Sequence, residues 1–449
     1  MTAPETEKPA AKCAVEMHEF KPCGREPYDD KGLCICHSEK PDKDDNAFQS
    51  EIDAMLERKD YDFGGFVFPD DAWFGGRVFD GPAWFVAATF QGAANFAPAT
   101  FEGEADFGGA TFQGDAYFFE ATFQGAAHFV GATFQGNAGF LGATFQGAAD
   151  FGGATFQGKA GFWRATFQGE AHFVGATFQG EADFVWATFK GEADFCQATF
   201  QGEARFVGSG DQRVFPREAV TDFGLVRFHQ PERVVFQHVF LGRARFLGAD
   251  VRRVDFTDVE WARRSGGRFA IWDELAPNEK EEKKDYALIG KLYRQLKYNY
   301  EEQRDPITAG DFHFGEMHMR RLSSPPTNVV LRFLRRNLSF LAWYRWISGY
   351  GEDYILPLAW IVGAIVAFAA AFAYIPSLAL QTVPSSGVSE PAAGLSSHLL
   401  YSLMCFLLRG DRPFQPAHLA GYYVSVAEGI LGPPLIAMFV LALNRRFKR

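Results

Sequence analysis

The sequence Ala-Thr-Phe-Gln-Gly stands at residues 121–125 and recurs at 132–136, 143–147, 154–158, 165–169 and 176–180. Around it, from Phe68 to Phe206, phenylalanine recurs at 26 positions in alternating steps of six and five residues, which gives an eleven-residue unit. An eleven-residue period can also belong to a helical coiled coil. However, glycine occurs throughout the repeat and costs about 1 kcal/mol at a helical position. Short extended sides with small residues at the corners fit better, so the chain is predicted to be mainly a β-solenoid.

The composition supports an ordered protein with an acidic middle. The chain has 449 residues, of which 49 are Phe and 47% are hydrophobic, and this excludes a mainly disordered chain. The net charge is −11, and residues 61–210 hold 16 acidic and 5 basic side chains, so the acidity belongs to this segment. Six cysteines are too few for a disulfide-stapled secreted protein of this size. Because the first residues contain no apolar signal segment, we expect a cytosolic start with reduced thiols.

The Ala-x-Phe sides resemble the pentapeptide-repeat proteins, in the variant where five- and six-residue sides alternate. This resemblance implies a right-handed quadrilateral β-helix with four sides per coil. The 26 sides divided by four give 6.5 coils, or a rod of about 31 Å at about 4.8 Å per layer. We extend the solenoid over residues 61–261, with a linker helix at 46–60. A helical linker pair is predicted at 262–325, because Tyr286, Ile289, Tyr293, Leu296 and Tyr300 follow helical spacing.

The C-terminal residues 326–449 are predicted to form a membrane module. Residues 355–375 carry no charge and are long enough to span a bilayer, and residues 422–443 form a second apolar stretch, which contains Glu428. Between them, the apolar run 397–408 would cover only about 18 Å as a helix, so it is predicted to re-enter rather than span. Residues 329–338 mix arginine with apolar residues and could lie on membrane lipid.

Basic residues flank the outer ends of both spans, so both termini are expected in the cytoplasm of a bacterium, with a multi-pass module in its inner membrane. They are Arg320, Arg321, Arg332, Arg335, Arg336, Arg345, Arg445, Arg446, Lys448 and Arg449.

Two spans around a half-helix resemble the pore module of two-transmembrane ion channels, which implies a homo-oligomer, with a tetramer favoured. In potassium channels of this plan, Thr-Val-Gly-Tyr-Gly-Asp follows the half-helix. Here Phe406, Leu407, Leu408 and Arg409 precede Gly410 and Asp411, so that filter is missing. The sequence Gly-Tyr-Gly-Glu at 349–352 precedes the first span and is interpreted as a turn.

Two charged residues of this module each leave two interpretations open. Arg409 would either line a pore mouth, where it would repel cations, or anchor the chain at lipid headgroups. Glu428 should face either a partner, Arg409 or Arg412, or an ion pathway, because a bare charge in hydrocarbon is costly.

Four cysteines and a histidine cluster near the N-terminus. Cys13, Cys23, Cys34 and His37 would supply a tetrahedral Cys3His site for structural zinc, within a module at residues 1–45. Cys36 is an alternative to Cys34 as ligand. The segment resembles the small cysteine/histidine module found ahead of some pentapeptide-repeat solenoids. Reduced thiols in an unstructured tail are the alternative.

No residue pattern indicates an enzyme. We favour an oligomeric inner-membrane channel-like protein with a non-potassium pore loop, whose cytosolic solenoid acts as a docking or sensing arm. The alternative is a non-conducting, membrane-tethered scaffold that binds a protein partner through the acidic β-helix. Some pentapeptide-repeat proteins mimic DNA, but the membrane segments argue against that here, and no nucleic-acid partner is expected.

Overall fold

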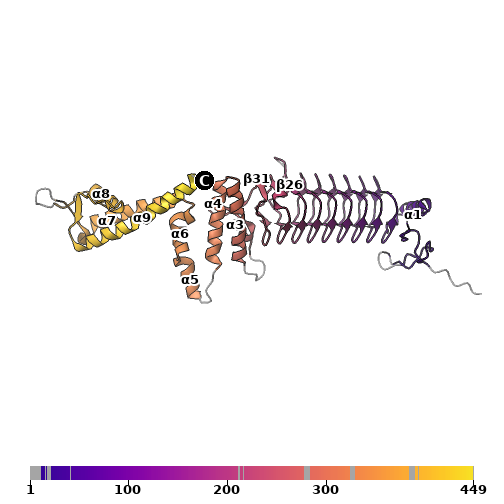
Figure 1. Ribbon diagram of the computed structural model, residues 1–449, viewed down its shortest axis with the longest axis horizontal. Coiled ribbons are helices and arrows are strands. Elements are labelled where there is room, and N and C mark those ends of the chain that lie inside the picture. The colour runs from indigo at the N-terminus through magenta and orange to yellow at the C-terminus, as the bar shows by residue number, and fades with distance from the viewer. Residues whose placement is uncertain are drawn as a thin grey trace, which may run out of the picture. The chain divides into compact units, whose positions relative to one another are not determined.

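The computed structural model describes residues 12–15, 17, 22–40, 42–210, 213–215, 217–277, 284–323, 329–383, 390–392 and 394–447. The chain divides into two compact units, Met1–Lys284 and Asp285–Arg449. Figure 1 shows the first as a β-solenoid and the second as a set of helices. Lys448, Arg449 and the side chains of Arg332, Arg335, Arg336 and Arg446 lie outside the described part.

Four stacks of short parallel strands form the walls of a right-handed quadrilateral solenoid, which confirms the predicted fold class. In the regular part of the repeat, each strand pairs with the strand 22 residues further on, as Thr111 pairs with Thr133, so one coil uses two eleven-residue units. In the last coils the offset varies, as between Ala204 and Val234, which are 30 residues apart. The longest stack has nine strands. The solenoid therefore has about nine turns, more than the 6.5 counted from the regular repeat, because irregular coils after residue 210 continue the stacks.

Most strands contain two residues. The first wall consists of β1 (Val67–Phe68), β5 (Thr89–Phe90), β9 (Thr111–Phe112), β13 (Thr133–Phe134), β17 (Thr155–Phe156), β21 (Thr177–Phe178), β25 (Thr199–Phe200) and β28 (Arg227–Phe228). The second consists of β2 (Ala72–Trp73), β6 (Ala94–Asn95), β10 (Ala116–Tyr117), β14 (Ala138–Gly139), β18 (Ala160–Gly161), β22 (Ala182–Asp183), β26 (Ala204–Val207), β29 (Val234–Gln237) and β31 (Asp255–Thr257).

The third wall consists of β3 (Val78–Phe79), β7 (Thr100–Phe101), β11 (Thr122–Phe123), β15 (Thr144–Phe145), β19 (Thr166–Phe167) and β23 (Thr188–Phe189). The fourth consists of β4 (Ala83–Trp84), β8 (Ala105–Asp106), β12 (Ala127–His128), β16 (Ala149–Asp150), β20 (Ala171–His172), β24 (Ala193–Asp194), β27 (Thr221–Asp222) and β30 (Ala244–Arg245).

The repeated phenylalanines fill the interior. The ring of Phe140 stacks between Phe118 and Phe162, with ring centroids 4.9 Å apart on each side. It also meets Phe129 and Phe151 edge-on, at 5.6 and 5.4 Å. Such stacked and edge-to-face pairs add attraction beyond the burial of apolar area. The fixed size of the ring therefore sets one repeating cross-section for the whole stack.

Small residues at the corners let successive coils approach closely. A Cβ atom at Gly147 would lie 2.5 Å from the carbonyl oxygen of Gly125 in the preceding coil. Alternate corners need a left-handed backbone, as at Gly153, where φ is +64°. These two demands explain why glycine recurs at fixed places in the repeat.

Separate elements cover the two ends of the solenoid. At the first coil lie the N-terminal segment and α1 (Asp45–Glu57), whose N-cap Asp44 accepts a hydrogen bond from the Ala47 amide. At the last coils, η2 (Pro231–Arg233) is followed by the hairpin β32 (Ala262–Arg263) and β33 (Phe269–Ala270), and then by α2 (Trp272–Leu275). Residues 262–275 thus end the solenoid, and the paired linker helices follow only after them.

The second unit begins with an antiparallel helix pair, α3 (Tyr286–Glu302) and α4 (Pro306–Leu322). Asp285 and Asp305 cap their N-termini with side-chain hydrogen bonds. At Gly315 a Cβ atom would overlap the ring of Tyr293, so the missing side chain is what allows close packing. Two short helices follow, α5 (Val329–Leu338) and α6 (Phe340–Ser348), and then the η3 turn (Gly349–Gly351).

The remaining helices are strongly apolar. Helix α7 (Ile355–Tyr374) is followed by η4 (Pro376–Leu378), strand β34 (Leu380–Thr382), the short helix α8 (Leu395–Phe406), strand β35 (Phe414–Pro416) and helix α9 (Leu419–Phe447). Both α7 and α9 are long and apolar enough to cross a membrane. Helix α9 continues through Pro433 and Pro434 and includes the whole predicted second span.

Candidate functional sites

The predicted ligands of the N-terminal metal site lie together. The ligand atoms of Cys13, Cys23, Cys34 and His37 all lie within 4.8 Å of one another. The His37 Nδ1 atom lies 3.6 Å from the Cys13 sulfur and 3.1 Å from the Cys34 sulfur, and the sulfurs of Cys23 and Cys34 are 3.6 Å apart. Around a tetrahedral zinc ion with bonds of about 2.0 to 2.3 Å, ligand atoms lie about 3.5 to 3.8 Å apart. This Cys3His cluster could therefore hold a metal ion.

Backbone hydrogen bonds shape the cluster. The Cys23 amide donates to the Val15 carbonyl and the Cys13 amide to the Arg25 carbonyl, which brings the first two cysteines side by side. In the Cys34 to His37 segment, the His37 amide donates to the Cys34 carbonyl at 3.1 Å, and this turn places both side chains on one side. The spacing Cys-x-x-His therefore acts as a local turn.

The imidazole of His37 is oriented from the solenoid. Its Nε2 atom lies 3.0 Å from the carbonyl oxygen of Gly64, to which it can donate. This bond leaves Nδ1, the atom that faces the sulfurs, with a free lone pair for a metal. The His37 ring also meets Phe66 edge-on at 5.1 Å. The cluster and the first coil are thus built as one structure.

Two basic side chains that the sequence patterns did not indicate lie beside the cluster. Arg25 donates to the Cys23 sulfur at 3.2 Å and pairs with Glu51 of α1 at 2.9 Å. Lys43 is buried and donates to the Val67 carbonyl at 2.6 Å, and burial lowers its pKa to about 8. Three thiolates around a divalent cation carry one net negative charge, which Arg25 would balance.

Cys36, the alternative ligand, is fully buried but lies outside the group whose ligand atoms converge. Its carbonyl accepts a hydrogen bond from the Val67 amide at 2.8 Å. The backbone of Cys36 therefore extends the wall of the first coil.

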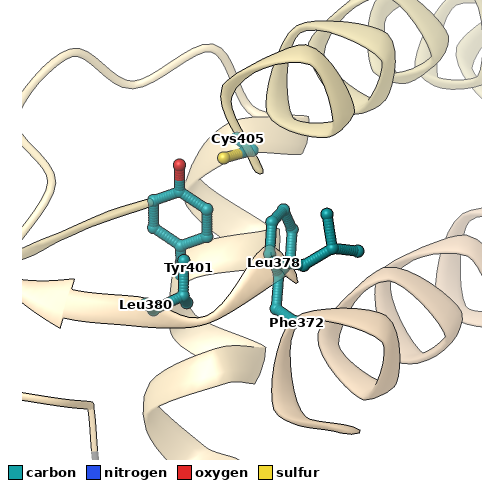
Figure 2. Close-up of a cluster of buried hydrophobic side chains, with 5 residues drawn as sticks. All are labelled: Phe372, Leu378, Leu380, Tyr401 and Cys405. Carbon is teal, nitrogen blue, oxygen red and sulfur yellow. The ribbon is translucent and has the colours of Figure 1, made fainter. Parts of the chain in front are cut away.

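The half-helix α8 packs between the two long apolar helices. Figure 2 shows the buried cluster in which Tyr401 and Cys405 of α8 meet Phe372 of α7. The rings of Phe372 and Tyr401 lie edge to face at 5.2 Å, and Leu378 and Leu380 complete the cluster. The Tyr401 hydroxyl lies 2.8 Å from Ser425 of α9. These contacts hold α8 against both neighbours.

The predicted pore-loop residues follow α8 in a compact turn. Phe406 is buried at the end of the helix, whereas Leu407 and Leu408 are half or more exposed. Leu408 has a left-handed backbone with φ of +54°, and the Arg409 amide returns to the Met404 carbonyl at 2.9 Å. The segment through Gly410 and Asp411 is exposed. Within one chain it forms a helix-ending turn rather than an extended row of carbonyls.

Glu428 is fully buried in α9, and its Oε1 atom is hydrogen-bonded to Ser402 of α8. In the described part of the chain, neither Arg409 nor Arg412 forms an ion pair with it. Arg412 instead donates to the Cys405 sulfur at 3.1 Å and to the Arg409 carbonyl at 2.7 Å. Ser402 could not be predicted as the partner, because a serine in an apolar helix has no distinctive pattern.

The family comparison agrees with the geometry of the solenoid. Residues 74–122, 118–166 and 162–210 match the family model described as pentapeptide repeats (9 copies). The resemblance of the Ala-x-Phe sides to pentapeptide-repeat proteins is thereby confirmed, and this part of the chain is a pentapeptide-repeat β-helix. No curated protein and no solved structure matches the chain.

Proposed function

We propose that this protein is an oligomeric membrane channel-like protein with a structural zinc module and a pentapeptide-repeat arm for docking or sensing. The packing of a short half-helix between two long apolar helices carries the proposal. In an oligomer, this arrangement would place the loop after α8, with Arg409 and Asp411, around a common axis. The loop lacks the potassium-type filter, so the proposed pore is of another kind, and the role is not enzymatic.

The exposure of α7 and α9 supports a membrane location. Large apolar side chains point away from the protein along both helices, among them Val362, Val366, Val426 and Ile430, each more than half exposed. Single exposed apolar residues are ordinary, but continuous rows along two such helices indicate lipid or partner contact. A buried core helix would not leave these rows uncovered.

Aromatic side chains near one end of the module fit a membrane interface. Trp343 and Trp346 of α6 are exposed by 56% and 66%, and the indole N–H of Trp360 in α7 donates to the Trp346 carbonyl at 3.1 Å. Tryptophan is enriched at the level of lipid headgroups. Together with the basic flanks of both spans, this supports an inner-membrane module of a bacterium, with both termini in the cytoplasm and α5 and α6 lying on membrane lipid.

Zinc in the Cys3His cluster would have a structural role. His37 and the Cys36 carbonyl contact the first coil through Gly64 and Val67. A solenoid end presents unpaired strands and an open core, so it needs a cap. A metal ion would hold this small polar segment in place as that cap.

The acidic solenoid is proposed to bind a basic protein partner. On its outer surface, the guanidinium group of Arg164 lies over the rings of Trp163 and Trp186, at 4.5 and 5.0 Å from their centroids. Tryptophan and arginine dominate the binding energy of many interfaces. The excess of acidic over basic residues in 61–210 would attract the partner at long range.

The channel proposal is tested with the full-length protein in detergent and in planar bilayers. We expect electron microscopy to show a symmetric ring with Arg409 at its axis, and Arg409→Gln to change the conductance or the ion preference, relative to Arg320→Gln as a control. A monomeric protein that stays silent under every ion gradient would refute the proposal.

The missing filter residues favour one alternative, a non-conducting scaffold that uses the module as an anchor. In that case, a basic partner should bind the full-length protein but not the Trp163→Ala, Trp186→Ala double variant. Binding that is equal in both proteins would rule out this docking surface.

A further inference from the structure

A buried polar site lies where the three apolar helices meet. It contains Glu428 of α9, Ser402 of α8 and the backbone carbonyl of Ile365 in α7. The side chains of Glu428 and Ser402 are both fully buried. One carboxyl oxygen of Glu428 is bonded to Ser402, and the other, Oε2, has no hydrogen-bond partner within the described residues.

The hydrogen atoms of this site can be counted. The Ser402 hydroxyl oxygen contacts Glu428 and also lies 3.0 Å from the Ile365 carbonyl. A hydroxyl carries one hydrogen, whereas an ionised carboxylate and a carbonyl carry none to donate. With an ionised Glu428, one of the two contacts must therefore lack a hydrogen. With a protonated Glu428, the acid donates to Ser402 and Ser402 donates to Ile365, so both contacts are satisfied.

The backbone around Glu428 also disfavours a negative charge. Gly429 and Gly432 let α9 approach the C-terminal end of α8, where carbonyls have no partner in the helix. A Cβ atom at Gly429 would lie 3.6 Å from the Cys405 carbonyl oxygen, and one at Gly432 would overlap the Phe406 carbonyl. A helix C-terminus carries partial negative charge. This environment favours a neutral acid or a bound cation over an ionised carboxylate.

The other polar groups near the site supply no neutralising ion pair. On α8, the Tyr401 hydroxyl bonds to Ser425, and Ser425 in turn donates to the Gly421 carbonyl at 2.7 Å. The guanidinium of Arg412 bonds to Cys405 and lies 5.7 Å from the Tyr401 ring centroid. From α7, the polar atom that reaches the site is the carbonyl of Ile365. Tyr401, Ser425 and the Ile365 carbonyl are thus uncharged, and Arg412 is hydrogen-bonded to Cys405 and acts on Glu428 through its charge alone.

We propose that Glu428 is a proton-binding site inside the membrane module, with Ser402 as its hydrogen-bonding relay to α7. In the arrangement described here, the carboxyl group holds the proton. Loss of the proton would leave the Ser402 hydroxyl with one hydrogen for two acceptors, the carboxylate and the Ile365 carbonyl, and would weaken the contact of α8 with its neighbours. The inference rests on the membrane placement proposed above, but it does not depend on conduction.

Infrared spectroscopy of the full-length protein in lipid nanodiscs tests the site. At neutral pH we expect a carbonyl stretching band of a protonated carboxylic acid, which disappears reversibly as the pH is raised. Glu428→Gln should abolish this band. Glu390→Gln, which changes an exposed carboxylate in the segment between α7 and α8, should leave it intact. Ser402→Ala should shift the band, because the acid loses its hydrogen-bond partner.

Several results would overturn the inference. One is a wild-type spectrum at neutral pH that matches that of Glu428→Gln in the region of the carboxylic-acid carbonyl band. Another is a band that vanishes when Na+ or K+ is raised at constant pH, because this would assign the site to a metal cation. If Glu428→Gln fails to fold, the wild-type pH titration and the shift in Ser402→Ala still decide the question. If bilayer recordings are silent but the carbonyl band of Glu428 is present and titrates with pH, the channel proposal is refuted and the proton-binding site stands.

Discussion

Replacing Phe140 with alanine should remove one ring from the middle of the solenoid core and leave a cavity that the neighbouring coils cannot fill. The ring is fully buried between the stacked rings of Phe118 and Phe162. Backbone bonds between coils, such as that from the Phe140 amide to the Gly161 carbonyl at 2.7 Å, keep the layers from collapsing. Because Phe to Ala changes in cores cost about 3 to 5 kcal/mol, we expect a loss of about 4 kcal/mol.

Hydrogen exchange of the full-length protein, followed by mass spectrometry, measures this loss locally. Each 1.4 kcal/mol is a factor of ten, so the slowest amides of residues 118–162 should exchange about a thousandfold faster in the variant. Phe228→Ala is the matched control. This ring is 8% exposed and lies 5.5 Å from Phe200 near the end of the stack, so its loss should cost about 3 kcal/mol, the low end of that range. Equal effects in both variants would refute the argument that stacking on both sides determines the cost.

Three further predictions concern the metal cluster, the corners and the C-terminal end of the solenoid. We expect elemental analysis to detect zinc in the wild type and in Cys36→Ser but not in Cys34→Ser, and equal metal content in both variants would contradict the assignment. Gly147→Ala should cost about 2 kcal/mol of unfolding free energy, because its Cβ would press on a backbone carbonyl. Gly161→Ala, whose nearest contact is 3.9 Å away, should stay within about 0.5 kcal/mol, and calorimetry that ranks the two alike would contradict this. Burial raises the pKa of Asp273 from 3.8 to about 6, so the folded chain binds this proton more tightly than the unfolded chain does. The free energy of unfolding should therefore fall as the pH rises from about 3.8 to about 6. Asp273→Asn should remove that slope, worth about 3 kcal/mol, from the pH dependence of exchange in the last coils.

The fold was largely predictable because one physical constraint repeats. The Phe spacing, the corner glycines and the family resemblance together specify the solenoid walls. The end regions were less predictable. After residue 210 the coils are irregular, and a hairpin and α2 at residues 262–275 precede the helix pair. No sequence pattern indicated these elements, because tertiary contacts such as Trp261 against Phe256 shape the end of the solenoid.

The candidate sites were predictable where they consist of residue types that are uncommon in the surrounding sequence. Three cysteines and His37 stand out in a short segment, and the structure brings them together. The partners that orient them, Arg25 and the Gly64 carbonyl, have no such signal because any arginine or any carbonyl could serve. In the same way, Glu428 stands out in an apolar helix, whereas Ser402 becomes notable only once α8 is packed against α9.

The turn at Gly349–Gly351 shows why a motif must be read with its surroundings. It contains the Gly-Tyr-Gly letters of a selectivity filter, yet Tyr350 is buried, and its carbonyl accepts a hydrogen bond from Arg445 at the end of α9, at 3.2 Å. The same Arg445 atom lies 3.4 Å from Glu352 and 3.4 Å from His313 of α4. The turn therefore joins the end of α9 to the α3 and α4 pair. Since α9 also carries Glu428, a displacement of α9 along its axis would have to break contacts at both of these places.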